Sequence, residues 1–433
     1  MYITLFEKQL IRSYLLSDQG EFFKNIYENY RINIITSKSL SEQIKISLAQ
    51  FSIESFVSVT TFENYKEGFL ARRISSIFKY GNKSVATVQF INYQRSLNGS
   101  LIKTFFRYCV YFLVANSKLL KKFLRYLYYS CLKLDKAKKC FSPELHLSRG
   151  DVLFVTSLSP LRGEDIPIAI FFKKQKTPVA ATVRSWDNLI ANGALLYLPD
   201  VFLCHSEYML NGALTRQGFN VDKVVMATTP SYQYKFFQRK PSYKDEHVNF
   251  SYMCQGTVVN PDDKNFVRWL VDMWKEMPKN FDLYIIQHPS FIMQDLQIKL
   301  PTNIRMMTFP YHETSLVDYY SHLSRMNLVI GGGTTGVLDA SFLEVPIVTI
   351  GFEIDPQNYW QSALRSFDYF PWTADFFNDS KITIAKTKES LVELILNYNS
   401  IDSLDTKTVK KYTGDPSVNI SQVLLKALTK YQN

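Results

Sequence analysis

The stretch Asn327-Leu-Val-Ile-Gly-Gly-Gly-Thr-Thr-Gly-Val-Leu-Asp-Ala-Ser-Phe-Leu-Glu-Val-Pro-Ile-Val-Thr-Ile350 reads as strand, glycine turn, helix and strand. Residues 328–330 form a short apolar run, typical of a strand buried in a parallel sheet. The three glycines at 331–333 allow a tight turn, and Thr334 or Thr335 can cap the helix that follows. This stretch therefore predicts a βαβ unit and an α/β fold.

The same turn predicts a phosphate site. Glycines such as Gly332 and Gly333 let a ligand approach the backbone, and the N-terminus of a helix offers free N–H groups and a positive dipole end. Asp339 follows about one helical turn later, where a carboxylate can reach a ribose hydroxyl. An ordinary ligand-free turn remains the alternative, because the stretch is neither a Walker loop nor GxGxxG.

Composition indicates a globular protein of two or three domains. The chain has 433 residues, of which 46% are hydrophobic and 21% are charged, and this excludes a disordered protein. No apolar run approaches the roughly 20 residues needed to cross a bilayer, and the N-terminus does not resemble a secretion signal. The five cysteines form no CxxC pair, so we expect no disulfide framework, no zinc site and a cytoplasmic location.

Positive charge is concentrated in one segment. The net charge is +11, and residues 101–140 carry ten Lys or Arg and a single acid, Asp135. Within them, apolar residues recur at helical spacing from 120 to 134, whereas Lys118, Lys121, Lys122 and Arg125 fall mostly off that stripe. Two readings remain open together: a helix that packs on the core with a solvated basic side, and contact with the anionic surface of the inner membrane, where each cation contributes about 1 kcal/mol. Nucleic acid is not expected, because no RNA-recognition signature accompanies the charge.

Strand and helix patterns alternate along most of the chain. We expect helix at 1–30 and 62–82, and strands at 32–36, 56–60, 85–91, 151–156, 178–183, 201–204 and 221–226. Residues 228–247 read as a linker, and strands resume at 249–254, 282–286 and 304–308. We expect an N-terminal Rossmann-like domain at 1–240 with a basic helical insertion at 62–140, and a C-terminal one at 241–410. Residues 411–433 are expected to form a final helix that can cross back to the N-terminal domain, and the last 50 residues to alternate helix with loop.

Three motifs in order resemble one enzyme family. Ser185-Trp-Asp-Asn188, followed by Gly193 and Pro199-Asp200, resembles the SWDN stretch of bacterial surface-polysaccharide transferases. Gln287-His-Pro289 at a strand end resembles their HP motif, and residues 333–340 with Pro346 resemble their donor turn. The likeness covers residues 150–350, and the first 150 residues match nothing. It implies GT-B glycosyltransferases of surface-polysaccharide synthesis, with two Rossmann-like domains and an interdomain cleft.

The resemblance implies a nucleotide-sugar donor in the C-terminal domain. His288 would donate to a donor phosphate, Thr334, Thr335 and the helix start would hold the phosphates, and Asp339 would bind the ribose. Gly256, Gly332 and Gly333 complete the expected donor site. These groups neutralise the leaving nucleotide, so neither a metal nor a cofactor is expected. His288 can instead bond to backbone at a strand end.

The base that activates the acceptor is expected from the N-terminal domain. Asp187 is the first choice, and Glu164 or Asp165 the second. Ser185, Trp186 and Asn188 are expected on the acceptor side. Two structural readings stay open, since Asp187 can serve as a turn or cap residue and Trp186 can pack in the core.

The expected function is an inverting, metal-independent glycosyltransferase that extends a surface glycan of capsule, O-antigen or lipooligosaccharide type. The E-x7-E pair of retaining enzymes is missing, because residue 347, eight after Asp339, is isoleucine. A lipid-linked acceptor would give the basic segment a purpose. The alternatives are a CDP-polyol phosphotransferase of teichoic-acid type, a UDP-sugar 2-epimerase, and a non-catalytic subunit that binds a nucleotide-sugar or a glycan.

Overall fold

The chain divides into two units. The computed structural model describes all residues except 18, 82–87, 89–90, 93, 97–98, 159–164, 192, 234–246, 256–259, 261, 290–297, 311–314, 334, 357–361, 363, 365–366, 368–370 and 432–433. Unit 1 comprises residues 1–91, 99–233 and 414–433, and unit 2 comprises residues 92–98 and 234–413. Among the described residues, no helix is long and apolar enough to cross a bilayer.

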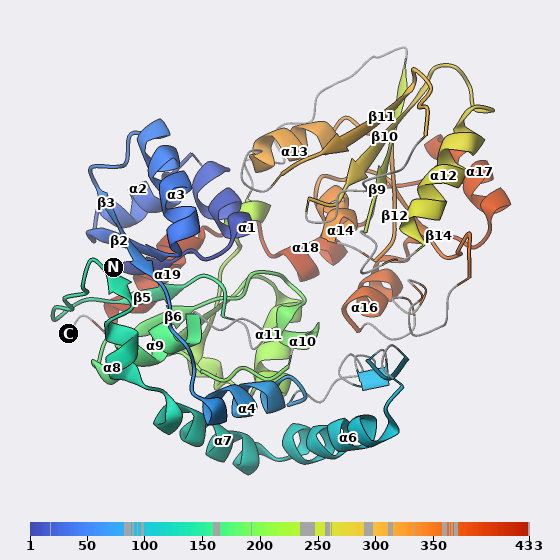
Figure 1. Ribbon diagram of the computed structural model, residues 1–433. Helices are drawn as coiled ribbons and strands as arrows, with labels where there is room; N and C mark the ends of the chain where they lie inside the picture. The colour runs from blue at the N-terminus through green and yellow to red at the C-terminus, as the bar shows by residue number, and fades with distance from the viewer. Residues whose placement is uncertain are drawn as a thin grey trace. The chain divides into compact units, whose positions relative to one another are not determined.

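Unit 1 is built on a sheet with the strand order β4-β3-β2-β1-β5-β6-β7-β8 (Figure 1). Its strands are β1 (Tyr2–Thr4), β2 (Ile32–Thr36), β3 (Val57–Phe62), β4 (Phe141–Ser142), β5 (Leu153–Val155), β6 (Val179–Ala181), β7 (Val201–Cys204) and β8 (Val224–Met226). Every neighbouring pair is parallel except β3 and β4. The strand order reverses between β1 and β5, which makes this the topological switch point.

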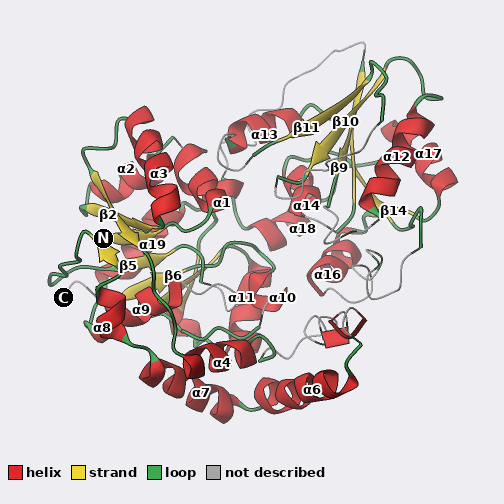
Figure 2. Ribbon diagram, viewed as in Figure 1, coloured by secondary structure: helices red, strands yellow, loops and turns green. Residues whose placement is uncertain are grey.

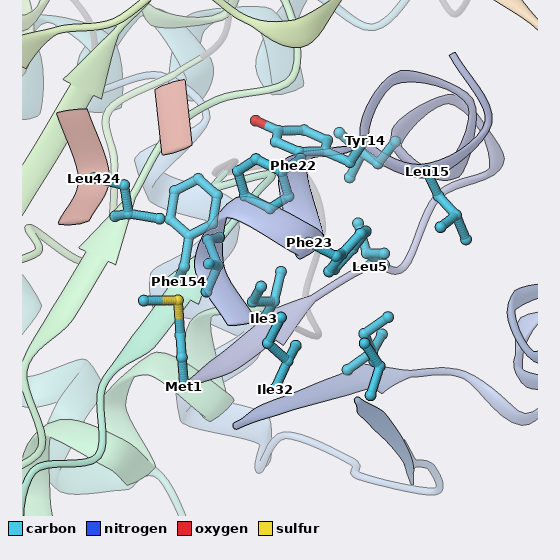
Figure 3. Packing of buried hydrophobic residues seen from close by; sticks show 14 of the residues in the cluster. Met1, Ile3, Leu5, Tyr14, Leu15, Phe22, Phe23, Ile32, Phe154 and Leu424 are labelled. Carbon is cyan, nitrogen blue, oxygen red and sulfur yellow. The ribbon is translucent and has the colours of Figure 1, made fainter. Parts of the chain in front are cut away.

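Helices complete unit 1. They are α1 (Lys8–Ile11), α2 (Glu21–Tyr27), α3 (Lys38–Gln50), α4 (Phe69–Phe78), α6 (Leu101–Asn116), α7 (Lys118–Cys131), α8 (Leu134–Lys138), α9 (Asp165–Lys174), α10 (Asn188–Ala191), α11 (Glu207–Gly212) and α19 (Ile420–Thr429). Figure 3 shows the core, where Ile3 of β1, Phe154 of β5 and Leu424 of α19 point toward the rings of α2. The last helix of the chain thus packs in the unit that contains the first strand.

Unit 2 is a six-stranded, fully parallel sheet in the order β11-β10-β9-β12-β13-β14. Its strands are β9 (Val248–Met253), β10 (Phe281–Gln287), β11 (Ile304–Thr308), β12 (Leu328–Gly331), β13 (Ile347–Ile350) and β14 (Thr383–Ala385). Its helices are α12 (Asp263–Trp274), α13 (Leu316–Leu323), α14 (Thr335–Phe342), α16 (Pro371–Ser380), α17 (Lys388–Leu396) and α18 (Thr406–Thr413) (Figure 2). The order reverses between β9 and β12, so this is the second switch point.

Most predicted elements are confirmed, and the exceptions have physical reasons. The prediction of helix throughout 1–30 is wrong, because β1 lies in the middle of the sheet; a three-residue strand buried on both sides leaves no periodic pattern. The helix expected at 62–82 is confined to α4. Strands β4 and β14 were not predicted, because they too are short and leave no periodic pattern. The strand expected at 85–91 falls mostly outside the described residues.

Candidate functional site

A hollow lies at the switch point of unit 2, where β9, β12 and β13 end. Parallel sheets bind ligands at this place, because the loops after diverging strands leave a crevice between them. The hollow is small, because its own volume is about 10 Å³ and reaches about 360 Å³ only when the space open to solvent is counted. The residues that line it are Tyr252, Gln255, Asn260, Asp262, Phe266, Gly332, Ile350, Phe352, Glu353 and Leu364.

The backbone at Gly332 lies directly against the amide of Gln255. A Cβ added to Gly332 would lie 2.1 Å from Gln255 Nε2 and 2.5 Å from Cδ. Gln255 itself is buried, so it has little space in which to move aside. The glycine at this position therefore lets the β12–α14 turn approach the loop after β9 and keeps the amide at the floor of the hollow.

Asp262 holds the loop that follows β13. Its carboxylate accepts the N–H groups of Ile354 at 2.6 Å and Asp355 at 3.1 Å, and the side-chain amide of Asn265 at 3.1 Å. Asp262 is itself buried. These three hydrogen bonds stabilise the buried carboxylate of Asp262. Asp262 therefore positions the loop that presents Glu353 to the hollow.

One wall of the hollow is aromatic. The ring of Phe266 lies 4.9 Å from that of Tyr252 and 5.7 Å from that of Phe352. The Tyr252 hydroxyl donates to Asp263, and burial raises the pKa of Tyr252, so the phenol stays protonated. An apolar wall with a few fixed polar groups is typical of a site that takes a flat ring.

The predicted donor-site residues lie at this edge of the sheet or near it. Gly332 lines the hollow, Gly333 is half-buried, and Thr335 begins α14 with its side chain exposed. His288 directly follows β10, the neighbour of β9, and its partial burial lowers its pKa. Thr334 and Gly256 lie outside the described residues.

Asp339 lies elsewhere. It is buried on the inner side of α14 and accepts the hydroxyl of Tyr319 at 3.2 Å and that of Tyr320 at 3.4 Å. Among the described residues, it is not one of those that line the hollow. The structure thus joins Asp339 to α13, and ribose binding by this residue stays a prediction.

A polar cluster occupies the switch point of unit 1. Glu7 follows β1, Ser157 follows β5, and Arg184 follows β6. The guanidinium of Arg184 donates to Glu7 Oε2 at 2.6 Å, and the Ser157 hydroxyl donates to Oε1 at 3.1 Å. The Glu7 side chain is only 9% exposed, so this ion pair is screened far less than a surface pair.

Asp187 adjoins this cluster in sequence. Burial raises the pKa of Asp187, and this effect outweighs a hydrogen bond from Ser185 and the charge of Arg184, which both lower it. A carboxylate whose pKa is raised is a better proton acceptor. The structure brings Ser185, half-buried, to the same turn, whereas Glu164 lies outside the described residues.

Trp186 and Asn188 are buried in this turn. The Trp186 ring lies 5.8 Å from the ring of Tyr208, so it packs in the core. Asn188 begins α10. Contact of either side chain with an acceptor stays a prediction. Asp165, the other candidate base, is buried at the start of α9.

Glu7 is the residue that sequence reasoning missed. The error follows from the prediction of helix at 1–30, which hid a strand end. A signal was present: the apolar Ile3 and Leu5 flank a small polar residue and are followed by a lone acid, the pattern of a short strand that ends in a functional loop.

The basic residues of α7 face two ways. Lys118 and Lys122 are exposed. Arg125 points inward, where its Nε donates to the carbonyl of Leu195 at 3.0 Å, and Lys121 lies 3.4 Å from the carbonyls of Gly81 and Ala115. Burial lowers the pKa of both, and both side chains contact carbonyl groups of unit 1, so their contact with a membrane stays a prediction.

Comparisons with known proteins concern the fold. No family model matches the chain, and no curated protein matches it. The structure is similar to UDP-GlcNAc 2-epimerase from Methanocaldococcus jannaschii, with a TM-score of 0.50, 11% identity, and coverage of 99% of this chain and 100% of that one. It is equally similar to a protein from Listeria monocytogenes assigned as a UDP-N-acetylglucosamine 2-epimerase, with a TM-score of 0.50, 8% identity, and coverage of 99% and 95%. MurG of Acinetobacter baumannii follows with a TM-score of 0.46, 10% identity and 99% coverage of both chains. The chain has the GT-B fold of two Rossmann-like domains.

Proposed function

We propose that this GT-B protein is a glycosyltransferase that moves a sugar from a nucleotide-sugar to a growing surface glycan. The observation that carries the proposal is the hollow at the switch point of unit 2, next to the first turn of α14. Aromatic, carboxylate and amide groups meet there beside a helix N-terminus, and these groups suit the base, the ribose and the phosphates of a nucleotide.

The donor is proposed to bind along the hollow. Its base would lie against Phe352, and the Glu353 carboxylate would accept the ribose hydroxyls. Asp339 was the sequence-based candidate for the ribose, but its bonds to two tyrosines favour Glu353 for that task. The diphosphate would meet the N–H groups at the start of α14 and the imidazole of His288.

The acceptor hydroxyl is proposed to be activated by Asp187. As the hydroxyl oxygen attacks the anomeric carbon, its proton passes to the carboxylate and the bond from that carbon to the diphosphate breaks. The raised pKa of Asp187 supports this role. Glu7 and Arg184 are positioning residues, since their ion pair fixes the segment that carries Asp187.

The test is consumption of a donor. The chain would be incubated with UDP-, GDP-, dTDP- and CMP-sugars and with CDP-glycerol, with and without oligosaccharide acceptors, and the products followed by NMR. Acceptor-dependent release of one nucleotide is expected, a nucleoside diphosphate from a UDP-, GDP- or dTDP-sugar or CMP from a CMP-sugar, together with loss of transfer in Asp187→Asn and full transfer in the control Asp222→Asn.

Other outcomes of this experiment would indicate a different function. Release of CMP from CDP-glycerol would make it a polyol phosphotransferase, with His288 at the transferred phosphate. Formation of a second UDP-sugar without an acceptor would make it a 2-epimerase. A nucleotide-sugar that binds without being consumed would contradict an enzyme and indicate a binding subunit.

A further inference from the structure

Three helices of unit 1 present an unusual outer surface. α4, α6 and α7 follow one another along this unit in Figure 1, with α7 in contact with both of the others. Among the residues that the structure describes, eleven of the fifteen exposed large hydrophobic side chains belong to these three helices. A patch of this kind marks an interaction site, because soluble surfaces rarely gather apolar side chains in one place.

The apolar side chains of α6 form one side of the helix. Leu101, Phe105 and Phe112 recur at i, i+4 and i+11, and Ile102, Phe106 and Leu113 repeat the spacing one residue later. The opposite side contains Thr104, Val114 and Ala115, which are buried. α6 therefore has one side that is buried against unit 1 and an opposite, exposed side that is apolar.

Fixed contacts hold the inner side of α7 to unit 1. Arg125 donates to the carbonyl of Leu195, and the Tyr129 hydroxyl donates to that of Leu196 at 3.1 Å. Gly193 allows its segment to pack closely against the end of α4, because a Cβ at this position would lie 2.2 Å from the carbonyl oxygen of Phe78. While these contacts hold one side of α7 to unit 1, its other side exposes Leu119, Phe123 and Tyr126.

The charge of this surface has one sign. α4 and α6 each carry two Lys or Arg, α7 carries four, and the three helices contain no Asp or Glu. Arg72 and Arg73 of α4 and Lys118 and Lys122 of α7 are exposed. The outer face thus combines apolar side chains with cations.

We propose that α4, α6 and α7 form a docking surface for a bilayer that contains anionic phospholipids. The helices lie in the plane of the interface, their Phe, Leu and Ile side chains enter the acyl boundary, and the cations reach the phosphate groups. A second copy of the chain fits less well. A two-fold interface would set this patch against itself and bring cations against cations.

Vesicle sedimentation of the full chain tests the proposal. Binding to vesicles of 30% phosphatidylglycerol in phosphatidylcholine would be compared with binding to phosphatidylcholine alone. Lys118→Glu/Lys122→Glu is expected to weaken binding at least fivefold for each cation removed, which corresponds to about 1 kcal/mol each. Added salt should weaken it in the same direction.

A matched pair of variants separates insertion from general hydrophobicity. Ile102→Ser/Leu119→Ser replaces side chains that are 74% and 82% exposed on α6 and α7, and Ile46→Ser/Val221→Ser replaces side chains that are 68% and 72% exposed elsewhere in unit 1. The first pair should lose vesicle binding and the second keep it. In Phe105→Trp, brominated lipids should quench the added fluorescence.

Three results would overturn the proposal. They are equal binding to neutral and anionic vesicles, equal loss in both serine pairs, and a dimer in solution that Ile102→Ser/Leu119→Ser dissociates while vesicles leave the chain unbound. The readout is lipid binding alone, so it does not depend on the proposed reaction.

Discussion

Gly332→Ala tests the contact on which the proposed donor site rests. The new Cβ would overlap the amide of Gln255, whose nitrogen lies 2.1 Å from that position. Gln255 is buried, and forcing a methyl group into a packed site costs about 1–3 kcal/mol. Gly332 is not among the described residues with a positive φ, so alanine suits its backbone and gains about 0.4–1 kcal/mol through the unfolded chain.

Removal of the partner should reverse the sign. In a Gln255→Ala background the overlap is gone, so only the gain from the unfolded chain remains and Gly332→Ala becomes stabilising. The coupling energy in the double-mutant cycle is therefore expected to be about 1–3 kcal/mol. In the wild-type background, the displaced amide should also weaken nucleotide binding at least tenfold.

Hydrogen exchange of β9 and β12 is the suitable assay, because it reports the opening free energy of unit 2 itself. Asn303→Ala is the control background, since Asn303 donates to the carbonyl of Phe281 at the amino end of the sheet. Equal effects of Gly332→Ala in the wild-type, Gln255→Ala and Asn303→Ala backgrounds would refute the reasoning.

Three further predictions follow from unit 1. Glu7→Gln leaves the charge of Arg184 uncompensated, so the pKa of Asp187 should fall and the acid limb of the pH profile of kcat/KM should move to lower pH; an unmoved limb would contradict the role of the pair. Gly414→Ala should cost about 2–5 kcal/mol in urea unfolding, because φ is +91° and a Cβ would lie 1.9 Å from a carbonyl oxygen, and a neutral result would refute this packing. Burial lowers the pKa of His205 to about 4, so its contribution to stability is complete above the unfolded pKa of 6.5 and is lost as pH falls toward 4, by about 3 kcal/mol. Urea unfolding at pH 7 and 4.5 should show that loss reduced in His205→Gln and retained in the control His146→Gln.

The sequence predicts the sheet of unit 2 well, because apolar runs, glycine turns and helical periodicity repeat there with regular spacing. It predicts that Gly332 approaches a ligand, and the structure places this residue in the hollow. A sequence pattern does not reveal which residues that are far apart in the chain contact one another in the fold. The partners of Asp339 are two tyrosines from the preceding helix, and Glu7 meets Arg184 across 177 positions.

The basic helix shows the same limit. Periodicity places Phe123 on the apolar stripe at 120–134 and Arg125 off it, and it leaves both core packing and membrane contact open for that stripe. In the structure Phe123 is exposed, whereas Arg125 donates to the carbonyl of Leu195 in unit 1. An amphipathic pattern gives the two faces of a helix and does not say which side chains of each face meet the rest of the protein.

The most direct test of the account is thermal unfolding with CMP, CDP, UDP, GDP and dTDP, each at about a hundred times a plausible dissociation constant. A bound nucleotide should add about 2.7 kcal/mol and raise Tm visibly. The account predicts a rise with one base, lost in Gly332→Ala and His288→Ala and kept in the surface variant Thr408→Ala. No rise with any nucleotide would contradict a donor site in unit 2 and with it the proposed transferase.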